Sequence, residues 1–194
     1  MIKFIYHLLT KNKFGSYYWK KKFGSFGNGS YIQGPGYVTG HENIYLGKNT
    51  TILSNNRLNV YNNLTGLKSK LILGNNCYIG FNFTALCGEN ITIGNEVLIA
   101  SNVFISSENH GMNPESQMPY MDQPLECKPV TIDDGTWIGE KVCILPGVTI
   151  GKKCIIGAGA VVNKSIPDYS IAAGVPAKVI KKYNFKTHSW EKVK

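Results

Sequence analysis

The sequence predicts an all-β solenoid, in which short strands and corners repeat along one axis. Aliphatic residues recur at every sixth position in the C-terminal half: Ile132, Ile138, Ile144, Ile150, Ile156 and Val162. A small or polar residue usually follows each of them, and mostly small or β-branched residues lie four positions on. This period is typical of a β-helix, because one hexad cannot bury its own apolar side chain and must stack on its neighbours.

The same phase occurs earlier in the chain, in three shorter runs. These are Leu46, Ile52 and Leu58; Leu73, Ile79 and Ala85; and Ile93, Ile99 and Ile105. We expect loops that leave the solenoid where the phase breaks. The largest, about residues 106–130, is polar, contains several prolines and lacks the hexad. A loop of this length in a compact domain is usually functional or disordered.

The composition fits one globular domain with a basic surface. The chain has 194 residues, 21 of them Lys or Arg against 12 Asp or Glu, for a net charge of +9. Such a surface suggests an anionic ligand or neighbour, but no nucleic-acid motif is visible and we expect no nucleic acid partner. The five cysteines form no CxxC motif. Cys77 and Cys154 fall on small inward positions, which indicates free core thiols in a reducing compartment.

The two ends of the chain lack the repeat. We expect an N-terminal cap segment at 1–30, the β-helix at 31–170, and a turn, a short helix near 177–183 and a tail within 171–194. Apolar residues at helical spacing near the start predict a short amphipathic helix. It would either cover the first coil or rest on an anionic membrane face. The apolar runs are too short to span a bilayer, and no signal peptide is expected.

The C-terminal half resembles the hexapeptide-repeat acyltransferases, and within them the maltose, galactoside and capsular-sugar O-acetyltransferases most. The string IGEKVCILPGVTIGKKCIIGAGAVVNKSIPDYSIAAGVPAKVIKKY carries this resemblance, which extends over about 71–183. It implies a left-handed parallel β-helix, an exception to the right-handed crossover rule. It also implies acetyl-CoA as acetyl donor, a sugar acceptor, and a homotrimer with active sites between subunits.

The resemblance implies a catalytic role for His110, in SSENHGMN at the start of the long loop. A neutral imidazole suits the removal of a proton from a sugar hydroxyl as that hydroxyl attacks a thioester carbonyl. Glu108 is a candidate to orient the imidazole, and a solvated loop acid is the alternative. Met112, Asn113 and Tyr120 lie on the same loop and are candidates to shape the acceptor pocket.

The resemblance also implies a coenzyme site. Trp137 would line the pantetheine channel, and two lysines would lie near the nucleotide phosphates, where an ammonium acts as a point charge. Asn82 would contact the acceptor, or else occupy a corner as Asn in a left-handed backbone conformation. The full set of expected coenzyme residues is Trp137, Ala158, Gly159, Asn163, Lys164, Lys178 and Lys181.

The leading hypothesis is therefore an acetyl-CoA-dependent O-acetyltransferase that acts on a sugar or surface-polysaccharide precursor. The alternative is an N-acetyltransferase for a nucleotide-linked amino sugar. A zinc hydrolyase on this fold would need three histidines from neighbouring coils, and we expect no metal. A non-enzymatic scaffold would not need the loop histidine. We expect a cytoplasmic enzyme whose basic, aromatic N-terminus suits the inner face of the membrane.

Overall fold

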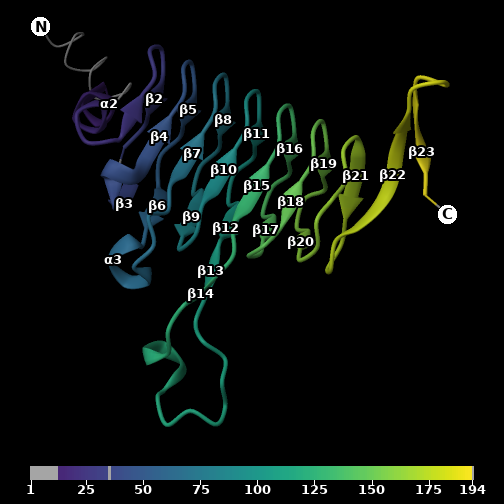
Figure 1. Ribbon diagram of the computed structural model, residues 1–194. Helices are drawn as coiled ribbons and strands as arrows, with labels where there is room; N and C mark the ends of the chain where they lie inside the picture. Colours follow the sequence, from purple (N-terminus) through teal and green to yellow (C-terminus); the bar gives the residue numbers. More distant parts are fainter. Residues whose placement is uncertain (1–12, 35, 194) are drawn as a thin grey trace, which may run out of the picture.

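The chain forms a left-handed parallel β-helix with three sheets as its faces. A computed structural model describes residues 13–34 and 36–193. Figure 1 shows the coils stacked along one axis, with a hairpin that stands out from the solenoid and a second hairpin at the C-terminal end. The prediction of an all-β solenoid with a long excursion loop is confirmed.

The first face, sheet A, has six parallel strands. Its inward residues are aliphatic, and each strand pairs with the next coil in register, as Ile91 does with Leu71 and Val130. The strands are β1 (Ser25–Phe26), β4 (Ile44–Leu46), β7 (Leu71–Leu73), β10 (Ile91–Ile93), β15 (Val130–Ile132) and β18 (Thr149–Ile150).

Sheet B forms the second face and has nine strands. The parallel part is β2 (Tyr31–Ile32), β5 (Thr51–Ile52), β8 (Tyr78–Ile79), β11 (Leu98–Ile99), β16 (Trp137–Ile138), β19 (Ile155–Ile156) and β21 (Ser170–Ala173). Two antiparallel strands, β22 (Lys178–Asn184) and β23 (Ser189–Lys192), extend it at the C-terminal end.

Sheet C closes the prism with six strands. They are β3 (Gly36–Thr39), β6 (Asn56–Val60), β9 (Thr84–Cys87), β12 (Phe104–Ser106), β17 (Cys143–Ile144) and β20 (Val161–Val162). The chain passes from A to B to C in each coil, so three edges run along the prism, which we call the A/B, B/C and C/A edges. The short helix α3 (Asn62–Thr65) and the hairpin of β13 (Glu108–Asn109) and β14 (Glu126–Cys127) both leave at the C/A edge.

The hexad residues point into the prism, as predicted. Every aliphatic residue of the period from Ile132 to Val162 is at most 1% exposed. Cys77 and Cys154 lie in the same core, and burial raises the pKa of both thiols. The break between Ala85 and Ile93 proves to be a wider corner at 88–90 rather than a loop that leaves the solenoid.

Corner residues with left-handed backbone conformation recur at the edges. The A/B edge holds Asn49, Asn76, Glu96, Gly135, Lys153 and Tyr169, all at positive φ. Beside them, side chains link successive coils: the Oδ1 of Asn95 accepts from the Asn75 N–H at 2.9 Å, and the Oδ1 of Asp134 accepts from the Asn95 N–H. Asn and Gly suit these corners because they adopt positive φ with little strain.

The prediction of a helix near 177–183 is wrong. This segment is strand β22, which pairs antiparallel with β21 and β23. Pairing satisfies the backbone of the last parallel strand, and Tyr183 and Trp190 pack across the hairpin at 5.3 Å between ring centroids. A tertiary contact of this kind overrides the weak helical pattern of a short segment.

At the other end, α2 (Lys13–Lys20) lies against the first coil. Trp19 packs against the core, and the Ser16 hydroxyl accepts from the Ile32 N–H at 3.0 Å. The amphipathic helix predicted from Ile2 to Leu9 lies outside the described residues. Among residues 13–34 and 36–193, no helix is both long and apolar enough to cross a membrane.

Candidate functional site

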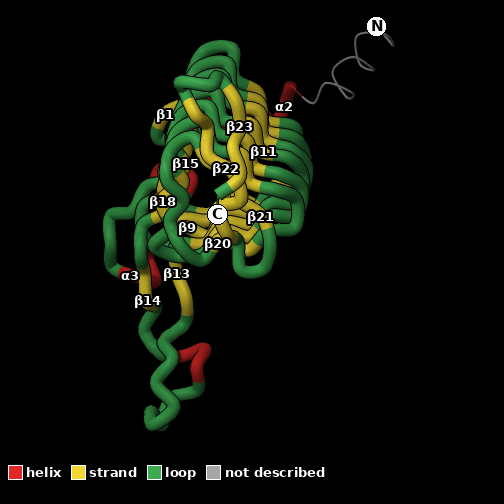
Figure 2. Tube along the Cα trace, turned by 90° about the vertical axis from the view of Figure 1, so that its right-hand side faces the viewer, coloured by secondary structure: helices red, strands yellow, loops and turns green. Residues whose placement is uncertain are grey.

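His110 lies on the long hairpin, just beyond the two paired strands β13 and β14. Figures 1 and 2 show this hairpin extending well away from the prism, next to α3. His110 is exposed and lines a hollow of about 410 Å³ together with Asn109, Gly111, Met112 and Tyr120. The structure therefore brings together the loop histidine and two of the three residues predicted to shape an acceptor pocket.

Gln123 fixes the two arms of this hairpin, and the sequence analysis missed it. Its side chain is 7% exposed. Its Oε1 accepts from the Asn113 N–H at 3.0 Å, and its Nε2 donates to the carbonyls of Asn113 at 3.0 Å and Met118 at 3.1 Å. A Cβ at Gly111 would lie 2.7 Å from the Cβ of Gln123. A glycine next to His110 thus allows the close approach of the two arms.

We predict that Gln123→Ala loosens the arm that carries His110. The substitution removes three hydrogen bonds around a buried amide, a change that costs about 1–3 kcal/mol. The Asn113 amide should then exchange its hydrogen about 5- to 100-fold faster in native-state exchange. Gln117→Ala, on the same loop but exposed, is the control and should leave that rate unchanged. Equal protection in both variants would contradict this role for Gln123.

Glu108 lies in β13, at the base of the hairpin and two residues before His110. A Cβ at Gly88 would lie 2.5 Å from the Cβ of Glu108 and 2.8 Å from the Cys127 sulfur, and the Glu108 N–H donates to the Ser106 hydroxyl at 3.2 Å. Desolvation, with smaller contributions from Glu108 and Glu89, raises the pKa of the Cys127 thiol. Within the described part of the chain, no hydrogen bond or ion pair joins Glu108 to His110. The orienting role suggested for Glu108 therefore has no contact to support it.

Trp137 and the two C-terminal lysines share the outer face of sheet B. Trp137 is 48% exposed, and its row continues through Ile155 and Ile171 to Lys181. A register shift in β22 pairs Lys181 with Ile171 and Lys178 with Ala173. Residues three apart in a regular strand face opposite sides, so this bulge is what places both lysines on the face of Trp137.

The remaining coenzyme candidates divide between two edges. Ala158 and Gly159 are exposed at the B/C edge, between β19 and β20, and Gly159 has a φ of 71°. Asn163 and Lys164 follow β20 and are exposed at the C/A edge, the edge from which the His110 hairpin leaves. That edge lies opposite sheet B. One chain therefore holds its candidate residues on different sides of the prism.

Asn82 is a corner residue at the B/C edge, with a φ of 56°. Its Nδ2 donates to Oδ1 of Asn102 at 3.0 Å, and Asn102 donates in turn to Glu140 at 2.8 Å. The second Glu140 oxygen accepts from the Ser101 N–H at 3.0 Å. This geometry matches the corner role that was the alternative for Asn82. Asn82 is not brought to the His110 hollow of its own chain.

Comparison with known proteins identifies the family. The model for bacterial transferase hexapeptide repeats matches residues 129–164, and a hexapeptide-repeat model of succinyl-transferases matches 70–107. A lipopolysaccharide biosynthesis O-acetyl transferase, WbbJ of Escherichia coli K12, whose name is qualified as putative, is 36% identical over 83% of each chain. The chain belongs to the hexapeptide-repeat acyltransferases.

Solved structures agree with this membership. A galactoside acetyltransferase in complex with coenzyme A is 31% identical, covers 91% of this chain and 75% of its own, and has a TM-score of 0.61. The N-acyltransferase AntD of Bacillus cereus, in complex with a dTDP-linked amino sugar and coenzyme A, has a TM-score of 0.72 over 87% of this chain and 88% of its own. At 24% identity, AntD shows the fold alone.

The hexapeptide-repeat acyltransferase described here has an all-β solenoid and an exposed loop histidine. Across residues 13–34 and 36–193, three or more His, Cys, Asp or Glu side chains nowhere gather as a metal-binding group. His110 was predicted from the family resemblance, in which its position at the start of the long loop matches a catalytic histidine. Gln123 has no such signal, because its role depends on the approach of two loop arms.

Proposed function

We propose that this acyltransferase transfers acetyl from acetyl-CoA to a hydroxyl of a sugar or surface-polysaccharide precursor. The observation that carries the proposal is His110, exposed in a hollow on an arm fixed by Gln123. Acetyl-CoA would supply the thioester. His110 would take the hydroxyl proton as the acceptor oxygen attacks the thioester carbonyl, a role suited to an imidazole. The C–S bond of the tetrahedral intermediate would then break, and coenzyme A would leave as the thiol with that proton.

The outer face of sheet B is the proposed coenzyme surface. Trp137 would contact the pantetheine arm, and Lys178 and Lys181, on the same face, would meet the phosphates. Ala158 and Gly159, at the adjoining edge, leave room for a narrow chain, since a Cβ at Gly159 would meet nothing within 4 Å. Asn163 and Lys164 would contact the coenzyme from the C/A edge of a second copy, and Asn82 would contact the acceptor.

We also propose a homotrimer in which each site lies between two subunits. His110 leaves the C/A edge, whereas the Trp137 row occupies the opposite face of the same chain. A second copy could bring its own outer face to this histidine, which supports an intersubunit site. The proposed location is the cytoplasm, near the inner face of the membrane.

Helix α2 and the turn after it fit a peripheral membrane contact. Tyr17 and Tyr18 are 64% and 53% exposed, and the Lys21 and Lys22 ammonium groups lie 4.8 Å and 5.6 Å from the centroids of these rings. Aromatic rings with neighbouring lysines suit an anionic lipid surface.

The decisive experiment measures thiol release from acetyl-CoA with a panel of sugars, amino sugars and their nucleotide-linked forms. Release with acceptors that carry hydroxyls only, lost in His110→Ala, is the expected result. Release restricted to amino sugars would replace the proposal with N-acetylation. The absence of both release and coenzyme binding would refute acetyl transfer.

Lys178→Ala should weaken binding of acetyl-CoA about tenfold, since a hydrogen bond to a charged group is lost. Calorimetric titration of the purified protein measures this affinity. The maximal rate should change much less, because the phosphates do not react. Lys68→Ala, an exposed lysine after α3, is the control. Unchanged affinity in Lys178→Ala would mean that this lysine is a solvated surface residue with no role in coenzyme binding.

A further inference from the structure

The C-terminal hairpin presents two unusual cross-strand pairs on one face. Lys181 is paired with Lys192, and Tyr183 is paired with Trp190. Partners in register lie on the same side of a sheet, and like charges directly opposite each other are destabilising. Neither lysine forms an ion pair within the described part of the chain. The two ammonium groups, which lie next to an aromatic pair, therefore have no anionic partner among the described residues.

An apolar hollow of about 330 Å³ adjoins these pairs. Lys153, Tyr169, Tyr183, Phe185 and Trp190 line it, and we call it the hairpin hollow. The Phe185 ring lies 4.9 Å from that of Tyr169 and 5.1 Å from that of Tyr183, both edge to face. Phe185 is nevertheless 59% exposed, so its ring remains accessible for stacking.

Two residues of this hollow occupy strained corners. Lys153 and Tyr169 have φ values of 52° and 53°, at positions that hold Asn or Gly in four of the five preceding coils of this edge. Large side chains rarely adopt this conformation. Residues held in it tend to cluster at functional sites.

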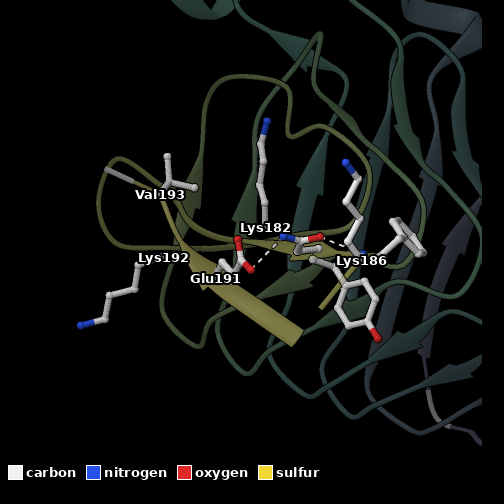
Figure 3. A pocket seen from close by; sticks show the side chains of 8 residues that line it. Lys182, Lys186, Glu191, Lys192 and Val193 are labelled. Carbon is white, nitrogen blue, oxygen red and sulfur yellow. Dashed lines mark hydrogen bonds between the residues drawn. The ribbon is translucent and has the colours of Figure 1, made fainter. Parts of the chain in front are cut away.

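The lysine side chains of the C-terminal hairpin extend to two different sides. Figure 3 shows Lys182 and Lys186 extending to one side of the hairpin and Lys192 to the other. Glu191 is engaged by Nδ2 of Asn184 and the Thr187 hydroxyl, both at 2.8 Å. Lys192 thus remains available on the face of the hairpin hollow, and Lys182 serves as its natural control.

We propose that the hairpin hollow binds the base of a nucleotide and that Lys181 and Lys192 bind its phosphates. The surface of the hollow is almost entirely apolar, which suits the π-face of a base better than a sugar ring, because a sugar ring needs polar partners. Two ammonium groups side by side suit a diphosphate. Lys181 also belongs to the proposed coenzyme surface, so the inference rests on that proposal at this one residue.

The nucleotide has two candidate sources. One is the 3′-phosphoadenosine end of the coenzyme, which would continue along β22 from Lys178 and Lys181 to the hollow. The other is a separate nucleotide, free or linked to an acceptor. Both have the same chemistry, and competition distinguishes them.

The test is calorimetric titration of the full chain with ADP. Phe185→Ala and Lys192→Gln should each raise the dissociation constant at least about fivefold, whereas Lys182→Gln should change it less than twofold. Ribose 5-phosphate should bind more weakly than ADP, because it lacks the base. Displacement of ADP by saturating coenzyme A assigns the hollow to the coenzyme, and undisturbed ADP binding assigns it to a separate nucleotide.

Three results would overturn the inference. They are no measurable ADP binding, equal binding of ADP and ribose 5-phosphate, or equal affinities in Lys192→Gln and Lys182→Gln. Near-native circular dichroism of Phe185→Ala must accompany the measurement, and Lys192→Gln provides an independent readout if that hairpin unfolds. Because binding is measured without an acceptor, failure here differs from failure of acetyl transfer.

Discussion

His110→Ala is expected to lower the turnover of acetyl transfer at least about 100-fold, which is the usual contribution of a general base. Without the imidazole, the acceptor hydroxyl must lose its proton to water while it attacks the thioester. The affinity for acetyl-CoA should change little, because the imidazole would act on the acceptor hydroxyl, whereas Trp137, Lys178 and Lys181 would hold the coenzyme. Steady-state rates of thiol release and calorimetric titration measure the two quantities.

Substitution of a second histidine, His188, is the control for this experiment. His188 lies in the turn of the C-terminal hairpin, away from the His110 hollow, and has a φ of 51°. Asn tolerates this conformation, so His188→Asn should fold and retain full turnover. Near-normal turnover in His110→Ala would remove this histidine from the mechanism. A loss of coenzyme binding in the same variant would instead indicate a structural role for the loop.

Phe83→Ala is expected to destabilise the fold by about 3–5 kcal/mol, the usual range for a buried phenylalanine. Phe83 is 0% exposed, and the next coils place Val103 and Val142 at the matching position. No neighbouring side chain of that column is large enough to fill the cavity. Unfolding by urea, followed by circular dichroism, should show a lower midpoint.

Phe81→Ala provides the comparison, since Phe81 lies on the same corner but is 43% exposed. Its removal should change the free energy of unfolding by less than about 1 kcal/mol. Similar midpoints for the two variants would mean that the cavity at Phe83 collapses, and the packing argument would fail.

The hexad period predicted the solenoid because one repeated pattern determines each element. Every inward aliphatic from Ile132 to Val162 is buried where the spacing put it. The C-terminal strand β22 escaped prediction because its strand conformation depends on pairing with the adjacent strands β21 and β23 rather than on a pattern in its own residues. A seven-residue segment with mixed lysines and aliphatics has too little periodicity to distinguish a helix from a strand.

The residues of the candidate site also divide into those that the sequence indicated and those that only the structure revealed. The sequence by itself determined the β-helix and singled out His110, because both follow from spacing along the chain and from the resemblance that this spacing supports. Tertiary structure decided that Gln123 holds the His110 arm, that a bulge aligns Lys178 with Lys181, and that Asn82 is a corner residue. These three depend on which segments meet in space, and hydrogen bonds between distant residues leave no period in the sequence.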